Sequence, residues 1–444
     1  MGRYGSSFKK RFDVMVKSAI NAQQRATNGL KILLGTPQMT QVQATWRFLN
    51  NPNVTIQELY EPIKEHLEKE IITQCHKYVL ALEDWSHLDY KKHTSKKELK
   101  SENRKDNGMK IGYDYQGAIA ASDITGEPIG VLDHNLKTAD NVYSTYDKSI
   151  DIKLTHLDEL KQRAKYMKES INTDKAIVHI VDRESDSIAF MRGLDEDNQL
   201  FVLRGKNNST VNYYDTDTKQ TVAIKQSELA NKLPLGKKVK NIKYKKKEVT
   251  IYANECDITI SRDATKWVIN EDGKKKLHKT KGKTLQVRFI VERLVNSENE
   301  VVAQWLLLSN LFDKDIDAKI LARWYYYRWK IESYFKLLKS SGFNVEEWQQ
   351  KEPLALFKRL LIISNACILV WKIANDNSDN AKTIRDFFIS LSGKQIQRGV
   401  DFTYPALLSG LESYLSTLDL LRRFSVEEIF KMRDDLVEII GLDI

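Results

Sequence analysis

The sequence has very few cysteines. Only Cys75, Cys256 and Cys367 occur among 444 residues, and they lie far apart in the chain. They give neither a disulfide framework nor a CxxC metal site, so a small disulfide-stabilised scaffold is excluded. A reducing compartment is the simplest interpretation.

Long apolar runs are also missing. The N-terminal segment MGRYGSSFKKRFDV has no apolar stretch after its basic residues, so we expect no signal peptide. The longest apolar stretch is Leu360–Trp371, which is too short to span a bilayer and predicts a buried helix. We therefore expect a soluble intracellular protein.

The composition favours a folded protein of several domains. Hydrophobic residues make up 41% of the chain and charged residues 29%, which is enough to fill a large core and excludes wholesale disorder. Single cores rarely exceed about 250–300 residues, so this length predicts roughly two to four domains.

Positive charge is concentrated in two segments. The net charge is +10, from 70 basic and 60 acidic residues. Residues 1–54 carry +7 and residues 236–283 carry +9, which leaves −6 for the other 342 residues. A basic protein favours an anionic partner, with nucleic acid as the first candidate. An ordinary basic enzyme without such a partner stays open.

Changes of hydrophobic period predict an α/β fold. Short apolar runs at Tyr78–Glu83 and Ala176–Val181 predict buried strands, and residues 205–300 alternate in a way that favours a Lys-rich β region. Lys91–Lys110 is expected to be a loop. Helical spacing is found in the following ranges: Thr55–Cys75, Leu157–Ser170, Asp317–Leu338 and Leu354–Asn375.

Two predicted strands are each followed by an aspartate, Asp84 and Asp182. Carboxylates at the ends of adjacent strands can converge on one hard cation, and Mg²⁺ prefers oxygen ligands. Aspartate is also a common turn residue at the end of a strand. For either residue alone, that second interpretation is favoured.

A third acidic residue lies on a predicted helix. Within Asp317–Leu338 and just after it, four polar residues stand at offsets 0, 3, 7 and 14: Tyr325, Arg328, Glu332 and Lys339. At about 100° per residue they fall within an arc of roughly 60°. A solvated face with Arg328–Glu332 pairing would explain the charges. It would not explain the aromatic residues crowded into the same turns, which also suit phosphate clamping and base stacking.

The same residues carry a family resemblance. The series Tyr325-(2)-Arg328-(3)-Glu332-(6)-Lys339 resembles the YREK signature of the DDE transposases of insertion-sequence family four. The matches follow the order of the family and cover about residues 40–375. Supporting segments are LALEDWS around Asp84, HIVDRESD around Asp182, FVLRGK around Arg204, WLLLSN from Trp305 and WRFLNNPNV over residues 46–54.

The resemblance implies an RNase H-like mixed-sheet catalytic core with a β-rich insertion, flanked by helical terminal domains. The expected division is a basic DNA-end-binding domain at 1–55, core at 56–204 and 301–375, the Lys-rich insertion at 205–300 and a helical C-terminal domain at 376–444. The last segment resembles the family only in being helical, so its role in dimerisation is an analogy.

The resemblance also implies an active site. Asp84, Asp182 and Glu332 would be the catalytic triad and would hold two Mg²⁺ ions, with Mn²⁺ as a substitute. Trp305 would stack with a flipped base, although a core aromatic is the alternative for this residue. DNA contacts are expected from Tyr325, Arg328, Lys339, Trp305, Arg204, Lys206, Lys9, Arg11, Arg25 and Arg47.

The resemblance predicts cut-and-paste transposition through strand cleavage, a hairpin and strand transfer. The partners would be double-stranded DNA, as terminal inverted repeats and target, and a second copy of the chain in a synaptic complex. The expected location is the bacterial cytoplasm at the nucleoid. Two alternatives stay open: a non-catalytic DNA-binding relative, and a metal nuclease without a joining step. The run Lys237–Lys247 either contacts DNA or is solvated.

Overall fold

The computed structural model describes residues 8–10, 12–16, 37–104, 108–182, 187–245, 247–269, 275–339 and 342–441. The chain divides into two compact units. The sheet unit comprises Ile56–Lys92 and Glu98–Ser333, and the helical unit comprises Met1–Thr55, His93–Lys97 and Tyr334–Ile444. The five segments expected from the sequence stay a prediction.

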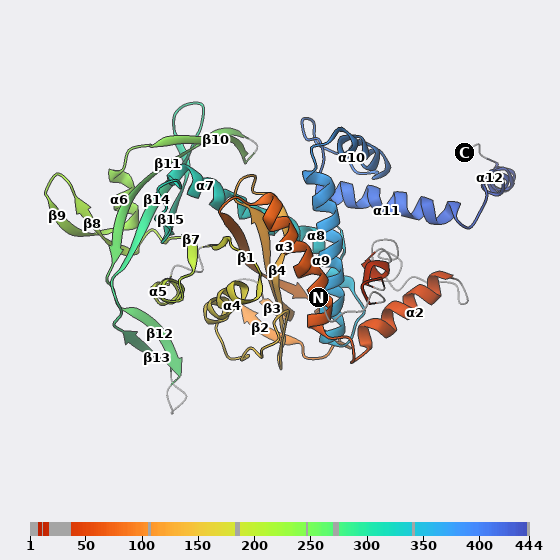
Figure 1. Cartoon of the computed structure of the whole chain (residues 1–444), viewed down its shortest axis with the longest axis horizontal. Helices are drawn as coiled ribbons and strands as arrows, with labels where there is room; N and C mark the ends of the chain where they lie inside the picture. The colour runs from red at the N-terminus through yellow and green to blue at the C-terminus, as the bar shows by residue number, and fades with distance from the viewer. Residues whose placement is uncertain are drawn as a thin grey trace. The chain divides into compact units, whose positions relative to one another are not determined.

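The sheet unit is built on one large mixed sheet (Figure 1). Its strand order is β5-β4-β3-β1-β6-β7-β15-β14-β11-β8-β9, with β2 paired to β3 and β10 paired to β11. Only the β1–β6 and β6–β7 pairs are parallel among the described strands. The mixed α/β architecture expected from the sequence is confirmed.

The sheet contains many strands, and short helices connect some of them. The strands of the large sheet are β1 Tyr78–Asp89, β2 Lys100–Arg104, β3 Gly108–Ser122, β4 Pro128–Lys137, β5 Val142–Ser144, β6 Ala176–Val181, β7 Leu200–Arg204, β8 Thr210–Asp215, β9 Gln220–Lys225, β10 Lys237–Tyr244, β11 Lys247–Ile260, β14 Leu285–Val295 and β15 Val301–Ser309. A separate hairpin is formed by β12 Ala264–Ile269 and β13 Lys275–Thr280. The helices are α3 Ile56–Gln74, α4 His156–Ser170, α5 Ile188–Glu196, α6 Gln226–Lys232, α7 Ala318–Tyr327 and α8 Trp329–Lys339.

The two larger hydrophobic clusters among the described residues cover the sheet with helices. Helices α3 and α4 pack through Leu67, Ile71 and Met167 against apolar residues of β1, β3, β4 and β6. Helices α5 and α6 pack through Met191 and Leu229 against β7, β11, β14 and β15. The parallel strands β1 and β6 read as continuous apolar runs in the sequence because they are covered on both faces.

Three expectations from the sequence are corrected. Strand β1 continues past Glu83 to Asp89, because it pairs with β3 along its whole length, so Asp84 lies inside a strand. The expected loop at Lys91–Lys110 contains β2, which pairs with β3. The expected helix Asp317–Leu338 is interrupted at Arg328, where the backbone N–H bonds to the carbonyl of Tyr325 in a tighter turn.

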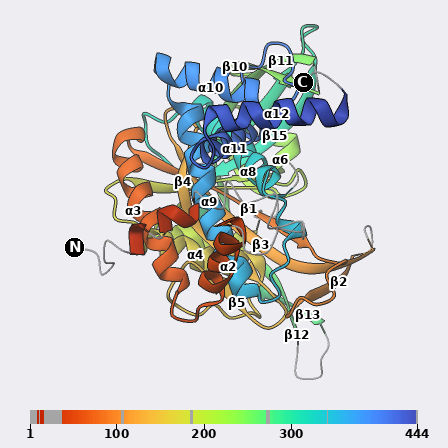
Figure 2. The ribbon, with the colours of Figure 1, turned by 90° about the vertical axis from the view of Figure 1, so that its right-hand side faces the viewer.

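The helical unit contains α2 Pro37–Asn50, α9 Pro353–Asn375, α10 Asp379–Leu391, α11 Tyr404–Leu421 and α12 Val426–Ile440. Helix α9 is long and apolar enough to cross a membrane by composition, but most of it is buried among the other helices. Helix α11 packs against α9 and α10. Helix α12 follows at the far end of α11 (Figures 1 and 2), and all of its residues are exposed or half-buried.

Candidate active site

The sheet brings Asp84 and Asp182 together. The parallel pairing of β1 with β6 runs from Tyr78↔Ala176 to Leu82↔Ile180, so the chain reaches Asp84 and Asp182 two residues after the last pair. Asp182 directly follows the last residue of β6. Both carboxylates keep about a third of their side-chain surface exposed, at 31% and 36%. They are therefore open to a ligand from solvent.

Arg328 joins these two carboxylates to Glu332. Its guanidinium lies 3.4 Å from Asp84 and 3.7 Å from Asp182, and it donates a 2.8 Å hydrogen bond to Glu332. The Arg328 side chain is only 4% exposed. One buried cation thus contacts all three acids that the sequence singled out.

The phenol of Tyr325 completes the cluster. It donates a 3.0 Å hydrogen bond to Asp182. Burial raises the pKa of Tyr325 and the negative charge of Asp182 adds to the effect, so the phenol stays protonated and acts as a donor. Tyr325 therefore fixes the orientation of one of the carboxylates.

The electrostatics of the site depend on Arg328. Burial raises the pKa of Asp84 to about 6; the Trp85 N–H and Arg328 oppose the rise, and Asp182 and Glu332 add to it. Burial alone would lower the pKa of Arg328, but Tyr325 and the three carboxylates reverse this and raise it. The cluster thus favours a positive charge at its centre.

The donor set fits a hard divalent cation. Three carboxylates offer only oxygen ligands, which suits Mg²⁺ or Mn²⁺. The buried guanidinium shows that a positive group fits among them. As the described residues stand, no group of three His, Cys, Asp or Glu side chains is arranged to hold a metal ion. Metal binding would therefore require the contacts between Arg328 and these carboxylates to be broken.

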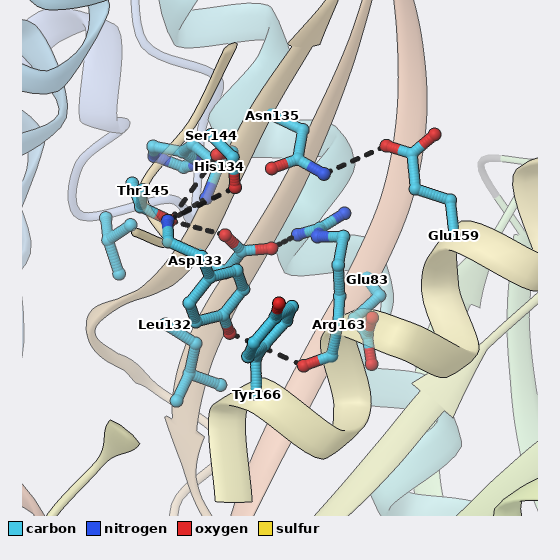
Figure 3. A network of polar contacts seen from close by, with 12 residues as sticks. Glu83, Leu132, Asp133, His134, Asn135, Ser144, Thr145, Glu159, Arg163 and Tyr166 are labelled. Atoms are coloured by element: carbon cyan, nitrogen blue, oxygen red, sulfur yellow. Dashed lines mark hydrogen bonds and ion pairs between the residues drawn. The ribbon is translucent and has the colours of Figure 1, made fainter. Parts of the chain in front are cut away.

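Buried polar side chains gather around Glu83, which precedes Asp84 in β1 (Figure 3). Glu83 is 1% exposed and contacts the His179 ring at 2.5 Å. Arg163 of α4 forms a fully buried ion pair with Asp133. His179 is itself buried in β6, at 1% exposure. The first pair links β6 to β1, and the second links α4 to β4.

Strands β7 and β15 place two further predicted residues beside the acids. Arg204, the last residue of β7, lies 3.7 Å from Asp182 and 6.0 Å from the centre of the Trp305 ring. Trp305 is half-buried within β15 and meets Tyr244 edge-on at 6.2 Å. Trp305 thus lies inside a strand. Lys206 follows β7 and is exposed.

The chain matches the family described as "Transposase DDE domain" over residues 146–371. That is just over half of the chain. The chain belongs to the DDE transposase family. Asp182 and Glu332 lie inside the matched residues, and Asp84 precedes them. No curated protein sequence matches the chain.

One solved structure is similar to this transposase at low identity. It is the piggyBac transposase synaptic complex with hairpin DNA, at 11% identity and a TM-score of 0.34. The likeness covers 96% of this chain and 74% of that one. At this TM-score it supports no residue-level comparison.

The other predicted DNA contacts of the transposase are dispersed. Lys339 belongs to the helical unit, where it pairs with Glu346 at 3.3 Å. Lys9 and Arg47 are exposed in the same unit. Arg11 and Arg25 lie outside the described residues.

Sequence reasoning missed Glu292 on β14. This residue is directly opposite Trp305 in the β14–β15 pair and is 1% exposed. Neither of its carboxylate oxygens has a hydrogen-bond partner among the described residues. Burial raises the pKa of Glu292 to about 8 against the opposing effect of Lys240 and Arg204. No sequence signal marks it, since a glutamate in a strand usually faces solvent.

Proposed function

We propose that this chain is a cut-and-paste DNA transposase of insertion-sequence family four, with an RNase H-like core. The observation that carries the proposal is the convergence of Asp84, Asp182 and Glu332 on one buried cation within a DDE family domain. A merely structural ion pair would need one carboxylate. Three of them around Arg328 leave a surplus of negative charge, which suits divalent metal.

Asp84, Asp182 and Glu332 would hold two Mg²⁺ ions, and Mn²⁺ would substitute. When bound, these ions would neutralise charge on the scissile phosphate and favour attack by water or by a 3′-OH. Tyr325 would keep Asp182 in position through its 3.0 Å hydrogen bond. Because water and 3′-OH are interchangeable nucleophiles at one site, the same residues would serve cleavage, hairpin formation, hairpin opening and joining to target DNA.

Several side chains near the triad would bind DNA. Arg204 lies beside both Asp182 and Trp305, so it is placed to contact a phosphate next to the reacting one. Half-buried Trp305 would offer a stacking surface for a base expelled from the bent strand. The proposed partners are the element's terminal inverted repeats, target DNA and a second copy of the chain.

The direct test is incubation of the full chain with DNA carrying the element's own terminal repeats. We expect strand cleavage that depends on Mg²⁺ or Mn²⁺, and a hairpin intermediate on the flanked end. Binding without cleavage in either metal would contradict the proposal and favour a non-catalytic relative. Cleavage without hairpin or joined products would instead indicate a metal nuclease.

A further inference from the structure

Arg328 occupies the position from which all three carboxylates can be reached. Its two terminal nitrogens are shared among Asp84, Asp182 and Glu332 at 3.4, 3.7 and 2.8 Å. Its Nε has no hydrogen-bond partner among the described residues. The guanidinium is therefore held by the carboxylates, together with the rings of Tyr325 and Trp329 at 6.0 and 5.1 Å.

A divalent cation and this guanidinium compete for the same oxygens. A metal ion needs the carboxylate lone pairs that now face Arg328, and two positive groups a few ångströms apart repel each other strongly in a buried site. The metal-free and metal-loaded arrangements therefore exclude each other. Arg328 is only 4% exposed, and moving its charge away would leave the three carboxylates without a cation. Because that is costly, a replacement cation must arrive.

The backbone at Arg328 departs from a regular α-helix. Arg328 is the residue between α7 and α8. There the N–H groups of Arg328 and Ile331 donate hydrogen bonds to carbonyls three residues earlier, which makes a tighter turn than a regular α-helix. Such short tight turns within helices often mark hinges. The side chain can thus be redirected without unfolding either helix.

We propose that Arg328 is an internal counter-cation that holds the three carboxylates before metal binds and releases them when metal arrives. Release would free its guanidinium for a DNA phosphate, so metal and DNA would each strengthen the binding of the other. This inference rests on the proposed function, because it takes the three carboxylates as the metal ligands.

The first test is calorimetric titration of the full chain with Mn²⁺ in the absence of DNA. Arg328→Gln should bind Mn²⁺ with a dissociation constant at least about tenfold lower than the parent, since the competing charge is gone. Lys330→Gln is the matched control, because it removes one positive charge from the 2.7 Å pair of Lys330 with Glu127. The control should bind like the parent. Unchanged or weaker binding by Arg328→Gln overturns the proposal.

The second test uses the unaltered chain, in case Arg328→Gln fails to fold. Phenylglyoxal modification followed by mass spectrometry should show severalfold greater labelling of Arg328 at saturating Mn²⁺. Labelling of Arg163, which is buried in its pair with Asp133, should not change. Constant labelling of Arg328 overturns the proposal.

The two proposals fail separately. Suppose that the chain cleaves DNA with metal, but Arg328→Gln binds Mn²⁺ no more tightly and metal does not change the labelling of Arg328. The proposed function then holds and the counter-cation role is wrong. A chain that shows both effects but never cleaves its terminal repeats retains the Arg328 exchange and lacks the proposed function.

Discussion

Glu292 shows how much a single residue's environment matters beyond its chemical type. It stands on a strand whose two faces are both buried, beside the half-buried Trp305. An acid in this position is held in its neutral form near neutral pH, because burial raises its pKa to about 8. Its folded-state pKa thus lies above the ordinary value of 4.5, and folding is favoured when the group is protonated.

Replacing Glu292 should stabilise the protein at alkaline pH. For an acid with a raised pKa, stability is complete below the unfolded value and falls as pH rises through the window from 4.5 to about 8. Glu292→Gln should remove that loss and raise the free energy of unfolding at pH 8 by about 1–3 kcal/mol. Urea denaturation at pH 5 and pH 8 measures the free energy of unfolding of each variant. Glu298→Gln, at an exposed position, is the control. Equal pH dependence in Glu292→Gln and the parent would contradict the account.

At the residue scale, the three candidate acids could be predicted from the sequence, but their arrangement around Arg328 could not. Asp84, Asp182 and Glu332 carry their signal in spacing and in neighbouring motifs. The sequence indicated pairing of Arg328 with Glu332 only, because helical spacing reveals neighbours at i+4 and not partners on distant strands. The burial of Arg328 among three acids needs the tertiary fold.

The elements themselves were predictable where hydrophobic period was strong. The limits of β6 Ala176–Val181 agree with the sequence pattern. Strand β2 and the second half of β1 were missed because their polar residues gain their pairing from β3, which lies further along the chain. The interruption at Arg328 was missed because α7 and α8 share one continuous apolar period.

Strand β10, the turn after it and the first residue of β11 carry a group of exposed lysines that we expect to bind DNA phosphates. Replacing Lys238, Lys243, Lys245 and Lys247 together with Gln should reduce the salt dependence of DNA binding. The log–log slope should flatten by about 0.9 for each phosphate that the variant no longer neutralises. Fluorescence anisotropy from low to moderate salt measures the slope. A variant with the parent slope would show that these lysines are only solvated.

At the level of the whole molecule, helix α12 buries none of its residues within the described part of the chain. Its side chains include exposed Leu436 and Ile440, at 44% and 45% of full exposure, which lie four residues apart and therefore on one face of the helix. Contiguous apolar surface of this kind usually marks an interface. The sequence suggested dimerisation here only by analogy, and that role stays a prediction, which the exposed face of α12 allows us to test.

Disrupting that face should change the oligomeric state. Leu436→Glu combined with Ile440→Glu should shift a dimer to a monomer in sedimentation velocity, because two buried charges would oppose apolar association. Asp434→Lys on the same helix also changes charge but removes no apolar side chain, and it should leave the dimer intact. A dimer that persists in the double variant would place the interface elsewhere.

The central claim is that Asp84, Asp182 and Glu332 form one catalytic centre. It is tested most directly by single-turnover cleavage of terminal-repeat DNA in Mg²⁺ by Glu332→Gln, with Glu127→Gln as the control that removes a carboxylate paired with Lys330. We expect Glu332→Gln to bind the DNA but to cleave it at least about a hundredfold more slowly, while Glu127→Gln cleaves like the parent. Cleavage by Glu332→Gln at the parent rate would contradict the account.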